Sequence, residues 1–235
     1  MPLLALFDVD GTLLLGHDEL SSRALLGSLR ELYDVELPED AVDRVDHPGQ
    51  TAKRIARELL RNERLDDWAI DELLDRWCSR FSETYVGLLS AADTVGWEAR
   101  AGAAVALREL ERGGVRLALL TGNPEPVARA RMKRLGLAQF FAPGTGAFGC
   151  EAEERGELIN LALERAGGWP PQEAAAVGDT PRDVSSAHEA GMRALIIRSA
   201  CATSDKRFDD ADAVVEDLES VARILLGWAG QSQTP

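Results

Sequence analysis

Short, continuously apolar runs alternate with amphipathic stretches over most of the chain's second half. Such runs are typical of strands that are buried on both faces of a parallel sheet. They lie at residues 3–7, 115–120, 174–177 and 194–198, with weaker ones near Phe140 and at residues 212–216. Segments with helical spacing of apolar positions separate these runs from residue 103 onward. The alternation predicts an α/β fold, a Rossmann-like parallel sheet with helices on both faces.

Residues 16–97 break this alternation. Apolar positions recur there at spacings of three and four residues over 20–33, 50–60 and 66–89, which is the spacing of amphipathic helices. Pro38, Pro48 and Gly49 interrupt the connections between them. We therefore predict an α/β core formed by residues 1–15 and 98–235, and a helical domain (the helical insertion, residues 16–97) inserted after the first strand.

Two carboxylates, Asp8 and Asp10, directly follow the first apolar run, and Gly11 marks a turn. Parallel sheets place their chemistry at the carboxyl ends of strands. One Asp in this position can attack phosphorus, and a second can carry a proton to and from the departing oxygen. An ordinary turn explains the pattern as well, because Asp and Gly are common turn residues. A calcium-binding loop does not, because three leucines at 13–15 follow where further oxygen ligands are needed.

Two further strand ends carry polar residues suited to the same chemistry. Thr121, Gly122 and Asn123 follow the second strand and precede a helix, so a hydroxyl and free backbone amides are available to bind a phosphate. Asp179 and Asp183 follow the third strand, and carboxylates are oxygen ligands of the kind that Mg²⁺ prefers. Each of these segments taken alone is an ordinary turn more often than a site.

Taken together, these motifs resemble those of the haloacid dehalogenase-like (HAD) hydrolase superfamily, specifically its phosphatases, and the resemblance spans nearly the whole chain. It implies that Asp8 is the nucleophile, Asp10 the general acid and base, and Thr121 a ligand of the transferring phosphoryl group. It also implies a Mg²⁺ cofactor. The metal ligands expected by resemblance are Asp8, the backbone carbonyl of Asp10, Asp179 and, directly or through water, Asp183.

The family also uses one cation that faces the nucleophile, and Arg155 is the residue expected in that role. Many family phosphatases have Lys followed by Pro here, so the Arg155-Gly156 pair departs from the pattern. The alternative is that Arg155 pairs with Glu151 or Glu154 on a solvated surface. We favour the functional interpretation, because phosphoryl transfer needs positive groups around the equatorial oxygens.

In related proteins, a helical insertion at this point forms a cap over the site, and a loop that enters one of its helices faces the substrate. Residues 46–51 resemble that loop, which makes His47, Gln50 and Thr51 candidates for substrate binding and specificity. A simple turn followed by a helix N-cap, without any ligand contact, explains the same residues equally well.

The function predicted from these residues is Mg²⁺-dependent hydrolysis of a small phosphomonoester, resembling the phosphoglycolate phosphatases, through an aspartyl-phosphate. Dehalogenation is disfavoured, because Asp10 is a proton donor that an alkoxide leaving group needs and a halide does not. A sugar phosphomutase of the same superfamily is the alternative among enzymes. A catalytically silent binding module on the same fold is the alternative from another class.

The composition of the chain disfavours some classes of binding partner and some cellular locations. The chain has 26 Lys and Arg against 40 Asp and Glu, a net charge of −14, which disfavours binding to nucleic acids or anionic membranes. Three widely spaced cysteines, Cys78, Cys150 and Cys201, form no metal-like pairing and are expected to be unpaired in a reducing cytoplasm. The start of the chain does not resemble a signal peptide, and no run approaches the length of a membrane span. We expect a cytoplasmic enzyme acting on a small phosphorylated metabolite, and leave open whether it is a monomer or a homodimer.

Overall fold

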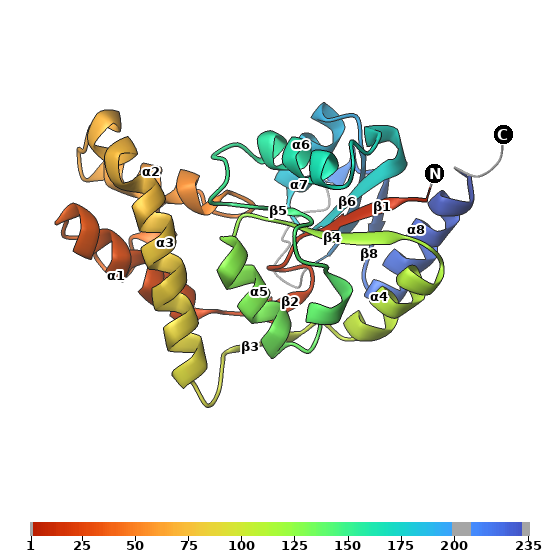
Figure 1. The fold of residues 1–235 in the computed structure, drawn as a ribbon, viewed down its shortest axis with the longest axis horizontal. Helices are drawn as coiled ribbons and strands as arrows, with labels where there is room; N and C mark the ends of the chain where they lie inside the picture. Colours follow the sequence, from red (N-terminus) through yellow and green to blue (C-terminus); the bar gives the residue numbers. More distant parts are fainter. Residues whose placement is uncertain (1, 199–207, 232–235) are drawn as a thin grey trace.

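The computed structural model describes residues 2–198 and 208–231. Its centre is a six-stranded sheet with the strand order β5-β4-β1-β6-β7-β8, in which every neighbouring pair is parallel (Figure 1). The strands are β1 (Leu4–Phe7), β4 (Arg116–Thr121), β5 (Ala147–Phe148), β6 (Ala174–Gly178), β7 (Arg193–Ile197) and β8 (Ala213–Val215). The predicted Rossmann-like α/β fold is confirmed.

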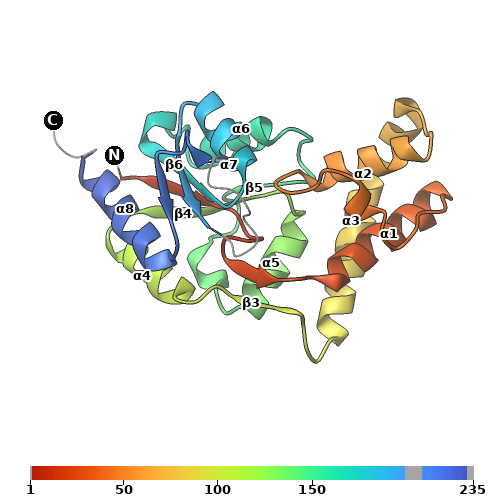
Figure 2. The same cartoon turned by 180° about the vertical axis from the view of Figure 1, so that it is seen from behind.

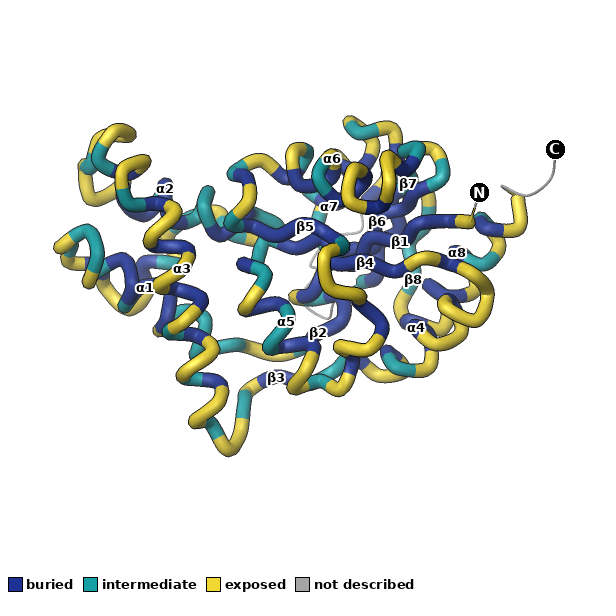
Figure 3. The backbone as a smooth tube through the Cα atoms, in the orientation of Figure 1, coloured by how far each residue is buried: buried dark blue, intermediate teal, exposed yellow. Residues whose placement is uncertain are grey.

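Helices cover both faces of the sheet, as Figures 1 and 2 show from opposite sides. On one face lie α4 (Ala103–Arg112), α5 (Glu125–Arg134) and α8 (Leu218–Gln231), and on the other lie α6 (Arg155–Arg165) and α7 (Pro181–Glu189). Because successive residues of a strand point to opposite faces, Ala5 and Phe7 join one hydrophobic core and Leu4 and Leu6 join the other. This double burial explains why β1 is continuously apolar, and the strands form the buried centre in Figure 3.

The helical insertion lies to one side of the sheet (Figure 1). It contains α1 (Glu19–Tyr33), a 3₁₀ turn (Val42–Arg44), α2 (Ala52–Asn62) and α3 (Asp67–Ala91). Two short antiparallel strands that the sequence did not reveal, β2 (Leu14–Gly16) and β3 (Trp97–Ala99), connect it to the rest of the chain. The predicted boundaries at residues 15/16 and 97/98 fall within these two strands, and the division into two domains stays a prediction.

One local expectation is wrong, and one expected helix is present with a shifted start. The strand expected near Phe140 is a 3₁₀ turn (Ala138–Phe140), and the neighbouring strand is β5, seven residues later, which is too short to leave a periodic signal. The helix expected from residue 50 begins after Thr51, whose side chain accepts a hydrogen bond from the backbone N–H of Arg54 and so acts as the N-cap.

The cysteine interpretation is also wrong for two of the three residues. Cys78 of α3 and Cys150, which follows β5, form a disulfide that joins the helical insertion to the core across 72 residues of sequence. Their separation along the chain hid the pairing, because only the folded contact of α3 with the core brings them together. Cys201 lies outside the described residues.

Among the described residues, no helix combines the length and apolar character needed to cross a bilayer. The cytoplasmic location stays a prediction, and the disulfide removes the support that it took from the cysteines.

Candidate active site

The polar residues that follow β1, β4 and β6 meet at one edge of the sheet. The three strands are neighbours and run parallel, so their carboxyl ends lie side by side. A cavity of about 870 Å³ opens at this edge. Nine of the predicted site residues line it: Asp8, Asp10, His47, Gln50, Thr121, Gly122, Asn123, Arg155 and Asp179. On the evidence of the described residues, Thr51 and Asp183 are not part of the cavity wall.

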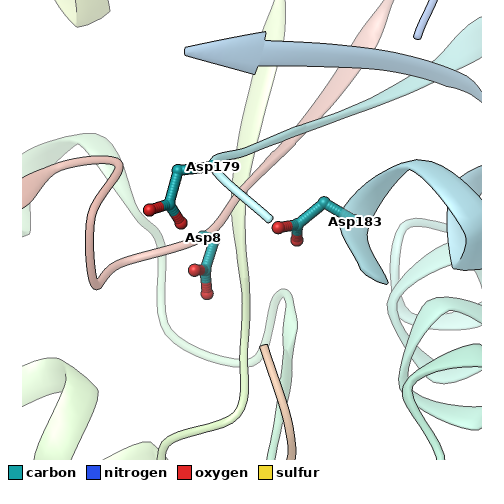
Figure 4. A group of neighbouring side chains, drawn as sticks. All are labelled: Asp8, Asp179 and Asp183. Atoms are coloured by element: carbon teal, nitrogen blue, oxygen red, sulfur yellow. The ribbon is translucent and has the colours of Figure 1, made fainter. Parts of the chain in front are cut away.

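Three carboxylates gather beside this cavity (Figure 4). Asp8, Asp179 and Asp183 each offer an oxygen atom, and these three oxygens lie within 4.8 Å of one another. Gly11 makes the arrangement possible, because a Cβ atom at that position would lie 1.9 Å from Oδ2 of Asp179. Gly178 does the same for Asp183, whose Cγ would lie 2.1 Å from a Cβ on that glycine. Glycine at both positions therefore leaves room for the acidic side chains.

The environment of Asp8 opposes its negative charge. Burial raises the pKa of Asp8 well above its usual range, and the carboxylates of Asp183, Asp10 and Asp179 add to this effect. Arg155 acts in the opposite direction and lowers the pKa. A divalent cation among these oxygens would remove the repulsion.

Arg155 is buried at the first residue of α6 and faces this cluster. Its Nη2 lies 3.6 Å from Oδ1 of Asp8 and forms an ion pair with Asp183. The alternative partners are engaged elsewhere, because Glu151 pairs with Arg165 and Glu154 pairs with Arg54. The expected cation beside Asp8 is therefore where the functional interpretation puts it.

Asp183 is held by the protein on both carboxylate oxygens. Oδ2 accepts hydrogen bonds from the backbone N–H and the hydroxyl of Thr180, at 2.9 and 2.6 Å, which forms a capping box at the start of α7. Oδ1 accepts from Arg155. These bonds fix Asp183 beside Asp8 and Asp179, while only 2% of its surface is exposed.

Asn123 connects the end of β4 to Asp10. Its Nδ2 donates to Oγ1 of Thr121 at 2.9 Å and to Oδ2 of Asp10 at 2.5 Å. The hydroxyl of Thr121 also accepts the backbone N–H of Asn123 at 3.3 Å. The carboxylate of Asp10 stays outside the acidic cluster, and its side chain is 51% exposed. It is thus accessible from the cavity, whereas Asp8 lies at the base of it.

The loop of residues 46–51 reaches the site from the helical insertion. His47 and Gln50 line the cavity, and a Cβ atom on Gly122 would lie only 2.0 Å from the carbonyl oxygen of Gln50. Thr51 is turned away: its hydroxyl donates to the carbonyl oxygen of Glu153 at 2.7 Å. Ala52 adds a backbone hydrogen bond to the carbonyl oxygen of Gly122 at 2.8 Å. The start of α2 is therefore docked directly on the segment after β4.

Sequence reasoning missed several residues that line the cavity, among them Arg100 and Arg131. Arg100 donates to the carbonyl oxygens of Gly11 and Thr12 and so holds the turn after Asp10. Arg131, on α5, pairs with Asp10. Neither lies in a motif. Arg131 is one of several basic residues on a helix that looks solvent-exposed, and only the fold shows that it is buried.

The acidic cluster fits a hard divalent cation such as Mg²⁺. All the donor atoms are oxygens, and three carboxylates lie around the single guanidinium of Arg155. Asp8, Asp179 and Asp183 are the side chains that would hold such an ion.

The family model of the haloacid dehalogenase-like hydrolases matches residues 3–191, a stretch that includes every site residue predicted from the sequence. The chain belongs to this family. The predicted enzyme of the hydrolase class is thereby confirmed.

The curated relatives of this HAD-like hydrolase include phosphatases, in agreement with the predicted enzyme class. A phosphoglycolate phosphatase of Rhodospirillum rubrum is 29% identical over 99% of the chain and 93% of the relative. Phosphoglycolate phosphatase 1 of Pseudomonas aeruginosa is 28% identical over 82% of the chain and 68% of the relative.

Among solved structures, CbbY of Rhodobacter sphaeroides in complex with phosphate has a TM-score of 0.68 at 24% identity. The match covers 94% of this chain and 96% of that one. At this level of identity the likeness confirms the fold.

Proposed function

We propose that this HAD-like hydrolase is a phosphoric monoester hydrolase that transfers the phosphoryl group of a small molecule first to Asp8 and then to water. The observation that carries the proposal is the position of Asp8, which lies between an acidic cluster suited to a divalent cation and the guanidinium of Arg155. Asp10 faces the same cavity with a half-exposed carboxyl group.

In the first step an oxygen of Asp8 forms a bond to phosphorus while the bond from phosphorus to the leaving oxygen breaks. Asp10 gives its proton to that oxygen. In the second step Asp10 takes a proton from water, whose oxygen attacks the same phosphorus, and the bond from phosphorus to Asp8 breaks. The products are the free alcohol and inorganic phosphate, and both aspartates return to their starting forms.

The remaining site residues stabilise the charge of the transferring group. Thr121 and the backbone after it are the proposed ligands of the phosphoryl oxygens, and Arg155 offsets the negative charge that Asp8 and the phosphate bring together. Asp8, Asp179, Asp183 and the carbonyl oxygen of Asp10 would hold Mg²⁺, which would supply further charge neutralisation.

The substrate is proposed to be a small phosphorylated metabolite of the phosphoglycolate kind. The two relatives described above carry that name, and residues of the helical insertion and of the core together line a cavity suited to a small molecule. His47 and Gln50 are the proposed contacts to the part of the substrate that leaves. The cytoplasm is the proposed location of such an enzyme.

The experiment is hydrolysis of p-nitrophenyl phosphate and of a panel of phosphorylated metabolites, with Mg²⁺ and with EDTA. We expect Mg²⁺-dependent release of phosphate by the parent and almost none by Asp8→Asn, while Asp93→Asn, which alters an exposed carboxylate, matches the parent. Equal activity of Asp8→Asn and the parent would refute the assignment of the nucleophile.

The same panel separates the alternatives. A phosphomutase would form an isomeric sugar phosphate without releasing phosphate. A silent binding module would release none and form no isomer.

A further inference from the structure

Arg131 is a deeply buried charged residue near the site. It lies on α5, is 2% exposed, and sits among the largest fully buried side chains of the molecule. Burying a guanidinium is costly unless charged partners offset the loss of water. Two carboxylates provide that compensation, because Nη1 lies 3.0 Å from Asp10 and Nη2 lies 2.7 Å from Asp18.

The guanidinium holds Asp10 in one orientation. Nη1 is 3.0 Å from each of the two carboxylate oxygens of Asp10 and 2.9 Å from Oδ1 of Asn123. Asn123 in turn donates to Oδ2 of Asp10. Half of the Asp10 side chain is exposed to the cavity, so packing alone does not fix it. These hydrogen bonds, and not burial, set the direction in which the carboxyl group points.

The other side of Arg131 contacts the helical insertion. Asp18 is the N-cap of α1, and Tyr85 lies in α3. The hydroxyl of Tyr85 donates to Oδ2 of Asp18 at 2.6 Å and accepts from Nε of Arg131 at 2.9 Å. The guanidinium carbon also lies 5.1 Å from the centre of the Tyr85 ring, within cation–π range. Arg131 therefore joins a core loop at the reacting centre to two helices of the helical insertion.

We propose that Arg131 is the positioning residue for Asp10, and that it holds Asp10 ready for proton transfer only while Asp18 and Tyr85 of the docked helical insertion support it. This inference rests on the proposed function, in which Asp10 is the proton donor and acceptor. Asp10 is therefore placed for proton transfer only when the helical insertion is docked on the core. As a consequence, proton transfer is coupled to closure of the cavity over the substrate.

The test compares two leaving groups. Departure of an alkoxide needs the proton of Asp10, whereas p-nitrophenolate departs with little help, and kcat/KM reports the first phosphoryl transfer. In Arg131→Met we expect kcat/KM to fall roughly 100-fold for the best alkyl phosphate of the panel. For p-nitrophenyl phosphate we expect a much smaller fall. A change that merely damaged the fold would lower both values by the same factor.

Tyr85→Phe keeps the ring and removes only the hydroxyl, so it tests the same coupling without leaving a charge unpaired. We expect a loss in the same direction, on the order of tenfold for the alkyl ester, in keeping with the loss of one hydrogen bond to charged groups. Tyr33→Phe is the matched control, because Tyr33 donates to the carbonyl oxygen of Ile70 inside the helical insertion, away from Arg131. It should keep the parent's ratio of the two kcat/KM values.

The outcomes are distinguishable. A parent that releases no phosphate from any ester overturns the proposed function and this inference with it. A working parent whose Arg131→Met and Tyr85→Phe variants keep its ratio of the two kcat/KM values overturns only the role of Arg131. If Arg131→Met does not fold, Tyr85→Phe alone decides between the two results.

Discussion

Gly122, in the segment after β4, packs directly against the backbone of Gln50 in the helical insertion. A Cβ atom on Gly122 would lie 2.0 Å from the carbonyl oxygen of Gln50, a distance that no real Cβ tolerates. The contact places the loop of residues 46–51 directly over the proposed phosphate ligands. Closing the cavity therefore requires glycine at residue 122.

Gly122→Ala should therefore displace the helical insertion from the site. We expect lower kcat/KM for every phosphomonoester and a loss of roughly 1–3 kcal/mol in the free energy of unfolding, as for overpacking of a tight contact. Gly87→Ala is the control, because Gly87 lies in α3 with nothing within 4 Å of an added Cβ. That change should stabilise the helix by up to about 1 kcal/mol and leave turnover unchanged. Parent-like turnover of Gly122→Ala would contradict the role of this contact.

The strand ends and their acidic residues could be predicted from the sequence because they depend on local patterns. Asp8 and Asp179 each directly follow a short buried strand, and neighbouring parallel strands bring such positions together. The contacts of Arg131 could not be predicted in the same way. Arg131 meets Asp10 across 121 residues, and the burial of its helix face depends on how α3 packs on α5.

The same reason applies to the Cys78–Cys150 disulfide and to Thr51. Two cysteines separated by 72 residues leave no local sequence pattern that indicates their pairing. A Thr that precedes a helix gives the same sequence pattern whether its hydroxyl faces the substrate or, as Thr51 does, the carbonyl oxygen of Glu153. Local chemistry was visible in the sequence, whereas the contacts between the helical insertion and the core were not.

Arg155 should be needed for both activity and stability. Arg155→Met leaves the buried Asp183 without its ion-pair partner, and breaking a buried pair in this way costs about 3–5 kcal/mol of unfolding free energy. Turnover should fall by at least 100-fold, because the charge that faces Asp8 is lost. Arg155→Lys keeps a positive charge and should recover part of the unfolding free energy and part of the turnover. Urea unfolding together with steady-state kinetics measures them, and a fully active Arg155→Met would show that the cation has no role in the reaction.

The raised pKa of Asp8 predicts how stability depends on pH in the presence of EDTA. Because the folded protein binds a proton at Asp8 more tightly than the unfolded chain, the stabilising effect of that proton is present near pH 4 and is lost as the pH rises through the raised pKa. At a pH above the raised pKa, the buried charge destabilises the fold by about 1.4 kcal/mol for each unit of the shift.

Asp8→Asn should accordingly have a higher Tm than the parent in EDTA at pH 7, with a smaller difference at pH 5. Mg²⁺ should raise the Tm of the parent more than that of the variant. A variant that is less stable than the parent under all of these conditions would contradict the electrostatic description of the site.

Reduction of the Cys78–Cys150 disulfide should destabilise the protein. A cross-link that closes a 72-residue separation restricts the unfolded chain, and the chain-entropy model gives this a value of roughly 4 kcal/mol. We expect a dithiol reductant to lower the Tm of the parent and to leave the Tm of Cys78→Ser unchanged. Equal Tm values for the parent with and without reductant, with free thiols counted in both samples, would show that this bond does not stabilise the fold.

The most direct test of the central claim is to identify the residue that carries the phosphoryl group during turnover. The parent is mixed with substrate and Mg²⁺, quenched in acid within the first turnover, and treated with borohydride, which reduces an acyl phosphate to an alcohol. We predict that mass spectrometry finds homoserine at position 8 in the parent and unmodified asparagine in Asp8→Asn. A parent that turns over while the modification appears at another residue, or at none, would contradict the account.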